Sequence, residues 1–364
     1  MKYKLSDICE YAKGKVAVET LDERTYISTE NMLPNKGGID KASSLPTIPQ
    51  TQEYLIGDVL VSNIRPYFKK IWHAEFEGGC SNDVLVFRAK NGTDPDFLYY
   101  VLANDEFFDY SMATSKGTKM PRGDKKALLE YEVPNYPLRI QRKIASLLKS
   151  IDGKIAINSE INKNLAKQVS SIYQAWFEDF SRFDGICPQT WKQGVLADIA
   201  SITSGKRPPM KSTDRTDEAM TPLVGAASVM GYTSEANHTD KILVTGRVGT
   251  HGVVQRFNTP CWTSDNTLVI KSDLYEYTYQ ILQRIDYHAL NRGSTQPLIT
   301  QGDMNKVAIL LPDKDILCEF EVLSGQLMSQ YEANLQENSK LAELRDTLLP
   351  KLMTGELDVS DIDL

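Results

Sequence analysis

One plan of segments occurs twice along this chain, and the repeat constrains the fold more than any single motif. The segment KLSDICEY, from Lys4, resembles VLADIASI, from Val195. A longer pair starts at Asp58 and Lys241. Both members show a β-branched strand, a basic turn, another strand, a Ser-Asn-Asp or Ser-Asp-Asn turn and a final apolar strand. The sequence therefore predicts two similar globular domains.

A loop rich in Gly, Ser, Thr and Pro also occurs twice. It reads SKGTKMPRGDKKALLEYEVP from Ser115 to Pro134, and NRGSTQPLITQGDMNKVAILLP from Asn291 to Pro312. Gly and Thr followed by Pro favour a rigid turn, which can present Lys119 in the first copy and Gln296 in the second. Contact with a ligand and a purely structural role both remain open for this turn.

A long helical pattern follows each copy. From Ile144 to Trp176, seam positions alternate by four and three residues, as in a coiled coil, and a less strict version runs from Phe320 to Leu348. Each predicted helix has about 38 residues and a length of about 57 Å. Because each helix has one seam, we expect the two to pack together, and the connectivity makes them antiparallel.

The predicted fold class is α+β. Two similar mixed α/β domains are separated by two long antiparallel coiled-coil helices, with a pseudo-two-fold internal repeat. The expected divisions are a first domain at 1–136, a central helix at 137–183, a second domain at 184–312, and a C-terminal helix and tail at 313–364. We expect the domains at opposite ends of the helix pair, with both termini near the first.

Two asparagines lie near the middle of each helical seam. Asn158 and Asn162 belong to the first helix, and Asn334 and Asn338 to the second. An antiparallel pair sets middle against middle, so we expect these amides to face each other and to fix the helix register. Rotation of one or both pairs towards solvent is the alternative.

The composition predicts a globular protein. The chain has 364 residues, of which 41% are hydrophobic, and it shows neither an apolar run long enough for a membrane span nor a signal-peptide pattern, so we expect a cytoplasmic location. Its five cysteines are scattered and never form a C-x-x-C pair, which argues against a disulfide framework or a zinc site.

The net charge of -7 is unevenly distributed. Residues 313–364 hold four Lys/Arg and twelve Asp/Glu, a charge of -8. Subtracting these from the totals of 41 and 48 leaves 37 basic and 36 acidic residues before residue 313, a charge of +1. Local basic clusters can therefore decide which partner the domains bind.

Common catalytic motifs are missing from the sequence. It contains neither a G-x-x-x-x-G-K-[ST] phosphate loop nor a G-x-G-x-x-G dinucleotide loop. The stretch KRPPM, from Lys206, lacks the amide or acid and the aromatic ring of the Asn/Asp-Pro-Pro-aromatic motif found in amino-methyltransferases. We interpret the chain as non-catalytic, with no metal or cofactor of its own.

Two similar domains at a fixed separation suit duplex DNA read at two half-sites. Sequence readout requires polar and basic side chains on loops that reach the major groove and the phosphates, and such residues recur at matching places in both copies. The DNA-binding candidates are Arg65, Tyr67, Lys69, Lys70, Lys116, Lys119 and Arg122 in the first copy, and Lys206, Arg207, Lys211, Arg215, Arg247, His251, Asn291, Arg292 and Gln296 in the second. For any one of them, a solvated surface charge is the alternative.

Three further segments resemble the specificity subunit of Type I restriction-modification systems, and the likeness extends over essentially the whole chain. They are PLRIQRKIASLLKSIDGKIAINSEINKNL from Pro137, YQAWFEDF from Tyr173, and LRDTLLPKLMTGELDV from Leu344. The resemblance implies a non-enzymatic subunit with two target-recognition domains, each reading one half of a split DNA sequence.

The resemblance also implies partners: duplex DNA, two methyltransferase subunits and, in the full complex, two restriction subunits. Adenine methylation, S-adenosylmethionine and ATP would belong to those partners. The outer faces of the helices and an aromatic group at the end of the first helix are the candidate docking surfaces. Packing against the second domain is the alternative for the aromatic group. This group consists of Tyr173, Trp176, Phe177 and Phe180.

Two other functions remain as alternatives. A protein-binding coiled-coil scaffold would bind duplex DNA weakly and without sequence preference. A stand-alone modification enzyme would bind S-adenosylmethionine, for which the sequence shows no Gly-rich pocket.

Overall fold

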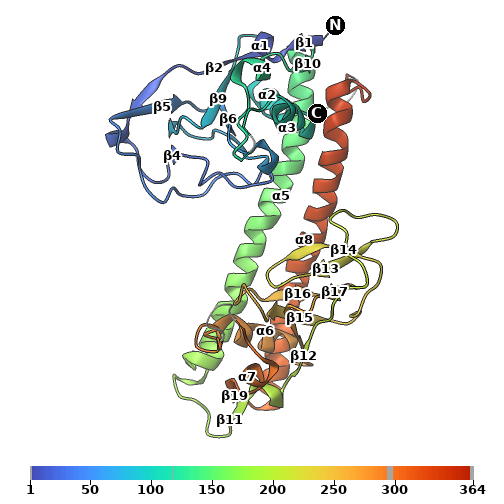
Figure 1. Ribbon diagram of the computed structural model, residues 1–364. Helices are drawn as coiled ribbons and strands as arrows, with labels where there is room; N and C mark the ends of the chain where they lie inside the picture. Colours follow the sequence, from blue (N-terminus) through green and yellow to red (C-terminus); the bar gives the residue numbers. More distant parts are fainter. Residues whose placement is uncertain (1, 118, 293–297, 361–364) are drawn as a thin grey trace. The chain divides into compact units, whose positions relative to one another are not determined.

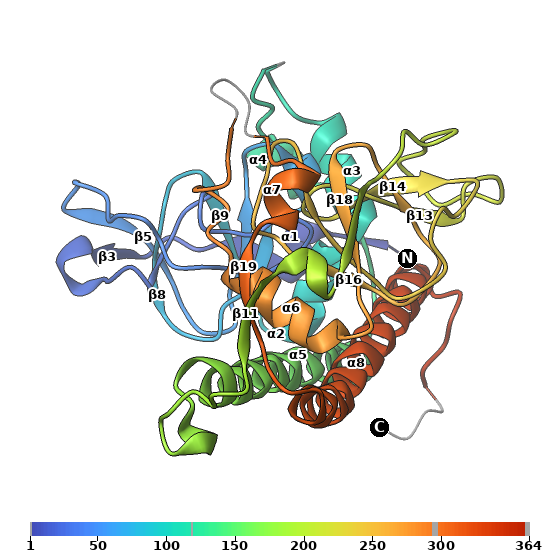
Figure 2. The same ribbon diagram turned by 90° about the horizontal axis from the view of Figure 1, so that it is seen from below.

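The computed structural model describes residues 2–117, 119–292 and 298–360, and its contacts divide the chain into two compact units. Unit 1 comprises Met1–Asn158 and Gln336–Leu364, and unit 2 comprises Ser159–Leu335. Each unit therefore combines one strand-rich segment with a part of each long helix (Figures 1 and 2).

The central sheet of unit 1 has four antiparallel strands. Their order is β2 (Cys9–Tyr11), β9 (Val84–Ala89), β6 (Val59–Ser62) and β7 (Ile71–His73). The two middle strands carry continuous apolar runs because both faces of the sheet are covered. Val59 and Phe87 join the core formed with helices α2 (Pro95–Ala103) and α3 (Asp105–Ala113), whereas Leu60 and Val86 belong to a second core.

That second core lies under a smaller sheet of unit 1. Its order is β3 (Lys15–Ala17), β5 (Gln50–Tyr54), β8 (Gly78–Cys80) and β4 (Tyr26–Ile27). The neighbours of Gly79 would lie within 3.0 Å of an added Cβ, so this position requires glycine. The remaining elements of the first strand-rich segment are β1 (Lys2–Lys4), which pairs with β10 (Glu132–Pro134), the short helices α1 (Leu5–Ile8) and α4 (Lys125–Leu128), and the 3-10 turns η1 (Val18–Thr20) and η2 (Pro66–Phe68).

The central sheet of unit 2 repeats the strand order of the central sheet of unit 1. Its central sheet runs β12 (Ser201–Ser204), β18 (Thr267–Lys271), β15 (Ile242–Gly246) and β16 (Gln255–Phe257), followed in sequence by helix α6 (Tyr275–Arg284). A three-stranded sheet contains β14 (Val229–Thr233), β13 (Thr221–Val224) and β17 (Trp262–Thr263). Strand β11 (Lys192–Val195) pairs with β19 (Ala308–Leu311). The remaining elements are the short helix α7 (Gln301–Asn305), the π-helical segment η3 (Gln174–Glu178), and the 3-10 turns η4 (Ser181–Phe183) and η5 (Leu196–Asp198).

The middle strands of the two central sheets pair in the same way, with β15 shifted by one residue relative to the sequence alignment that starts at Asp58 and Lys241. In unit 1, Val59 lies opposite both Phe87 and His73. In unit 2, Leu243 lies opposite Ile270 and Arg256 in the same way. The repeat predicted from the sequence is therefore a repeat of three-dimensional structure.

Buried charges link three elements of unit 2. The Arg256 guanidinium, on β16, donates to both carboxylate oxygens of Glu276 on α6, at 2.6 and 2.8 Å, and to Glu332 on helix α8, at 2.9 Å. The side chains of Arg256 and Glu276 are only 7% and 5% exposed. The guanidinium also lies over the rings of Tyr275 and Tyr279, 4.8 and 4.7 Å from their centroids. This cluster attaches the sheet to the long helix through charge-assisted hydrogen bonds.

The two long helices are α5 (Leu138–Tyr173) and α8 (Lys314–Thr354), with 36 and 41 residues. They pack antiparallel within each unit (Figure 1): Asp152 pairs with Arg345 in unit 1, and Tyr173 contacts Phe320 in unit 2. Gly355, with φ of +77°, follows the last residue of α8, as expected for a glycine that ends a helix. The predicted α+β class, with two mixed domains and two packed long helices, is confirmed.

No helix among the described residues is long and apolar enough to cross a membrane.

Candidate nucleic-acid interface

Two of the predicted basic groups meet at one edge of unit 1. The chain leaves β6 and forms η2, which is flanked by Arg65 and Lys69. The Arg65 amide donates to the Pro121 carbonyl, and Ile64 forms a β-bridge with Arg122. The turn at 65–70 therefore lies against the repeated loop that contains Lys116, Lys119 and Arg122.

Most cations of this edge have a partner within the protein. Lys69 pairs with Asp105 at 2.9 Å, and Arg122 with Asp83 at 3.2 Å. Lys70 donates to the Thr29 carbonyl at 2.7 Å, and burial lowers its pKa. The exposed Arg122–Asp83 pair contributes little to stability, so an external ligand can compete for Arg122 at small cost.

Two carboxylates order the same edge. Asp124 accepts hydrogen bonds from the Lys116 side chain and from the backbone amides of Lys126 and Ala127 at the start of α4. The hydrogen bond from Lys116 is the main reason that the pKa of Asp124 falls to about 2. Burial opposes ionisation of Asp105, but the ammonium groups of Lys36 and Lys69 outweigh it and lower the pKa of this carboxyl.

A small cavity opens beside this turn. It has a volume of about 210 Å³ and is lined by Arg65, Phe68, Lys70 and Met120, together with Thr29, Ser62 and Ile64. Tyr67, Phe68 and Met120 are 48%, 38% and 47% exposed, so this cationic edge also presents apolar surface.

Unit 2 builds the equivalent edge in the same way. The Arg247 amide donates to the Asn266 carbonyl at 2.8 Å, as the Asn63 amide donates to Asp83 in unit 1. The Ile299 amide donates to the Arg247 carbonyl, and Val248 forms a β-bridge with Leu298. The turn after β15 therefore also lies against the repeated loop.

The predicted residues of this second edge differ from one another in their contacts and exposure. Arg292 pairs with Asp303, and the Asn291 side chain accepts from the Leu298 amide at 2.9 Å. His251 is half-buried, with Nδ1 3.3 Å from the Gly246 carbonyl oxygen. Gln296 lies outside the described residues.

A third basic group, at 206–215, lies near the Ser-Asp-Asn turn at 264–266, which also contains Asn266. Lys206 donates through its backbone amide to the Thr263 carbonyl, and Arg207 lies 3.7 Å from Asp265, with its side chain 89% exposed. Arg207 and Lys211 line a cavity of about 500 Å³ with Asp265 and Asn266. Lys211 and Arg215 are exposed.

The four asparagines form two pairs between α5 and α8. In unit 1, the Asn158 amide donates to Asn338 at 2.9 Å and to Glu337 at 2.7 Å. In unit 2, the Asn334 amide donates to Asn162 at 2.9 Å. Asn158, Asn162 and Asn334 are at most 4% exposed, and Asn338 is half-buried.

The aromatic group expected on a docking surface lies in the core of unit 2 instead. Tyr173, Trp176 and Phe177 are at most 9% exposed and contact the Phe320 ring. Phe180 is half-buried against Trp191. The helix end adds its rings to an apolar core, which corrects the expectation of an exposed patch.

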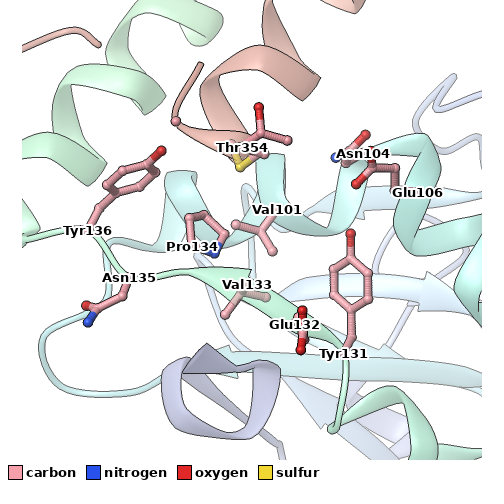
Figure 3. Close-up of a pocket in the computed structure, with 12 residues that line it drawn as sticks. Val101, Asn104, Glu106, Tyr131, Glu132, Val133, Pro134, Asn135, Tyr136 and Thr354 are labelled. Carbon is pink, nitrogen blue, oxygen red and sulfur yellow. The ribbon is translucent and has the colours of Figure 1, made fainter. Parts of the chain in front are cut away.

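The cavity shown in Figure 3 lies elsewhere in unit 1, between β10 and the end of α8. It measures about 420 Å³, and its lining includes Glu106, Glu132 and Tyr131 but no lysine or arginine among the described residues. These carboxylates do not suit an anionic group such as a nucleotide phosphate. In the part of the chain that the structure describes, no group of three or more His, Cys, Asp or Glu residues could hold a metal ion.

Comparison with known proteins explains the duplicated architecture. The family described as Type I restriction modification DNA specificity domain matches residues 1–167 and 188–345. The chain belongs to this family. It is a specificity subunit with two specificity domains, and catalysis in a Type I enzyme resides in the partner subunits.

Individual relatives agree with this placement. The specificity subunit of the MjaIX enzyme from Methanocaldococcus jannaschii is 26% identical over 75% of this chain and 71% of its own length. The HindI specificity subunit from Haemophilus influenzae is 22% identical over 98% of this chain and 99% of its own. The crystal structure of a Type I S subunit from M. genitalium shares the fold, with a TM-score of 0.63 and 18% identity over 99% of this chain and 96% of that one.

Sequence reasoning did not single out several residues that shape these two edges. Asp105 and Lys36 hold the turn of unit 1, and Asp83 and Asn266 anchor the equivalent turns in the two units. The repeated Ser-Asn-Asp and Ser-Asp-Asn turns did signal Asp83 and Asn266. Nothing in the sequence pattern linked Asp105 to a turn some 40 residues earlier, because that contact depends on how α3 packs.

Proposed function

We propose that this subunit reads a split duplex DNA target, with each domain reading one half. The supporting observation is that both units bring the turn after the middle strand and the repeated loop together beside an equivalent Ser-Asp/Asn turn. The proposed recognition domains are 1–136 and 184–312, and the segments 137–183 and 313–364 act as the helical spacer.

We assign the cations of these edges to DNA in two roles. Arg207, Lys211 and Arg215 are exposed and suit phosphate contacts, which position a protein on the duplex. Arg65, Lys69, Lys70, Arg122, Arg247 and Arg292 lie on or beside ordered turns, where fixed side chains suit base edges in the major groove. Lys116, Lys119, Lys206, Tyr67, His251, Asn291 and Gln296 complete the proposed contact set.

We further propose that two methyltransferase subunits dock on the helix pair and that two restriction subunits join them in the full complex. Exposed apolar residues support this surface, because neighbouring apolar side chains that form a continuous exposed patch mark protein contacts. On α5, Ile157 and Ile161 are one turn apart and 58% and 41% exposed, and Leu335 and Leu344 on α8 are 50% and 47% exposed. Of the two docking candidates, the helix faces therefore remain.

Chemistry and cofactors are assigned to the partners. Adenine methylation with S-adenosylmethionine and cleavage driven by ATP would belong to the methyltransferase and restriction subunits, while this subunit selects the DNA. A cytoplasmic location, where such a complex meets DNA, stays a prediction.

The test is the methylation pattern that the subunit directs. The chain is co-expressed with its methyltransferase subunit in a host without other modification systems, and methylated adenines are mapped by long-read sequencing. We expect a motif with two specific halves around a fixed unspecific gap. A soluble complex that methylates no such motif would contradict the proposal, and the methyltransferase subunit expressed alone is the control.

A variant pair locates the reading edge. Replacing Arg65 and Arg122 with alanine should abolish or relax one half of the motif, because both cations lie at the edge of unit 1. Replacing Lys13, an exposed lysine of unit 1 outside both loops, should leave the motif unchanged. If both changes affected the methylation motif equally, the motif would not be read at this edge.

A further inference from the structure

The turn at 65–70 of unit 1 is fixed in an unusual backbone conformation. Among the described residues, six non-glycine residues have positive φ, and four of them lie in this turn or in the loop beside it: Asn35, Lys36, Arg65 and Lys69, with φ between 50° and 60°. Left-handed backbone is unfavourable for residues with a Cβ, and it is retained where surrounding contacts determine it.

Those contacts form a clasp around the turn. The amides of Asn35 and Lys36 donate to the carbonyls of Phe68 and Lys69, at 2.8 and 2.9 Å. On α3, the Asp105 carboxylate binds the ammonium groups of Lys36 and Lys69, each at 2.9 Å. One carboxylate thus joins the two left-handed segments that meet at the turn.

The clasp presents an apolar tip between cations. Tyr67 and Phe68 are exposed, and their ring centroids lie 4.6 Å apart at an interplanar angle of 51°. The Lys70 ammonium lies 5.9 Å from the Phe68 ring centroid, and Arg65 borders the same cavity. Exposed rings favour a flat apolar partner, and cations on both sides favour a negatively charged one.

Duplex DNA combines these two properties, since stacked bases lie between rows of phosphates. We propose that Tyr67 and Phe68 form a wedge that enters a base step of the half-site read by domain 1, and that Asp105 is the positioning residue that holds the wedge ready. This inference rests on the proposed DNA function and deepens it. Apolar wedges unstack base steps and bend the duplex in other DNA-binding proteins.

The two domains differ in this respect. The equivalent turn of unit 2 reads RVGTHGVV from Arg247 and contains no Tyr, Phe or Trp. Its left-handed positions are Gly249 and Gly252, which adopt positive φ without strain. We therefore expect only the half-site of domain 1 to prefer flexible steps, such as a pyrimidine followed by a purine.

The experiment uses the complex of the full chain with its methyltransferase subunit, and a duplex carrying the methylated motif with 2-aminopurine at successive steps. Unstacking raises the fluorescence of this probe. We expect a rise at one step of the half-site read by domain 1, lost in Tyr67→Ala and kept in Tyr67→Phe. Loss of one aromatic stacking contact should weaken DNA binding by about 5- to 150-fold.

The positioning role of Asp105 has its own controls. Asp105→Asn should lower both the fluorescence rise and the preference for a flexible over a stiff step, and Asp105→Glu should restore part of each. Asp109→Asn makes the same change one turn later on α3, at an exposed position with no ion pair among the described residues, and should change neither.

Three outcomes would overturn the wedge while leaving the proposed function intact. The first is unchanged fluorescence and DNA affinity in Tyr67→Ala, and the second is a fluorescence rise at the same step in both half-sites. The third is loss of the methyltransferase subunit from the Tyr67→Ala complex, which would make the tip a protein contact. Failure of the proposed function is distinguishable, because the wild-type complex would then direct no split methylation motif. Circular dichroism of each variant separates these outcomes from misfolding.

Discussion

The two amide pairs between α5 and α8 provide a direct test of how the helices are matched. Asn158 binds Asn338, and Asn334 binds Asn162. Replacing Asn162 and Asn334 together with leucine removes both members of one pair. Replacing Asn158 and Asn334 adds the same two leucines but takes one residue from each pair.

The difference between these double variants isolates the pairing. A buried polar group that loses its partner costs about 1–3 kcal/mol, whereas removing both partners is close to neutral or stabilising. The crossed variant leaves the Asn162 carbonyl without the Asn334 amide at a site that is 4% exposed. Asn338 loses only its contact with Asn158, and that loss costs less because Asn338 is half-buried. We expect the crossed variant to be less stable by about 1–3 kcal/mol.

Thermal unfolding followed by circular dichroism measures this difference, at about 2–4 °C in melting temperature per kcal/mol for a unit of this size. The matched variant should melt at or above the wild-type temperature, because a polar seam residue costs stability in return for register. Equal melting temperatures for the matched and crossed variants would refute the pairing. So would a crossed variant that melts higher than the matched one.

Three further changes test other parts of the structure. Arg256→Met leaves the Glu276 carboxylate buried without its cation and should destabilise the protein by about 3–5 kcal/mol in urea unfolding, whereas Lys271→Met, at an exposed ion pair, should cost less than about 1 kcal/mol. The depressed pKa of Asp124 stabilises the fold above the unfolded pKa near 4 and loses that effect as pH falls towards about 2. The stability gap between wild type and Asp124→Asn should therefore shrink over that window, and a constant gap would contradict the assignment. If Arg207 binds a phosphate, Arg207→Ala should reduce the slope of log affinity against log salt by about 0.9, and an unchanged slope would remove it from the contact set.

The repeat and the long helices were predictable because they depend on periodic signals. Alternation by four and three residues marked the seam of α5 and α8, and the matched strands marked two domains of one design. Antiparallel pairing followed from connectivity alone. Which asparagines pair was not predictable. A shift of one helical turn would set Asn158 against Asn334, or Asn162 against Asn338, without changing the pattern of seam residues.

The candidate site was predictable in part. Matching basic loops indicated both edges, and the structure places each turn against its repeated loop. The aromatic group at the end of α5 misled the prediction, because composition does not distinguish an exposed ring from one in a core. The Asp105 clasp could not be foreseen either, since it depends on left-handed backbone at Lys36 and Lys69, which have no conformational signature in the sequence.

The most direct test of split recognition is a domain exchange followed by methylation mapping. Residues 1–136 are replaced by the corresponding segment of a related specificity subunit with a different known motif, and the chimaera is expressed with the methyltransferase subunit. We predict that one half of the methylated motif changes to that of the donor, while the other half and the gap stay the same. A motif in which both halves change, or in which neither does, would contradict the assignment of one half-site to each domain.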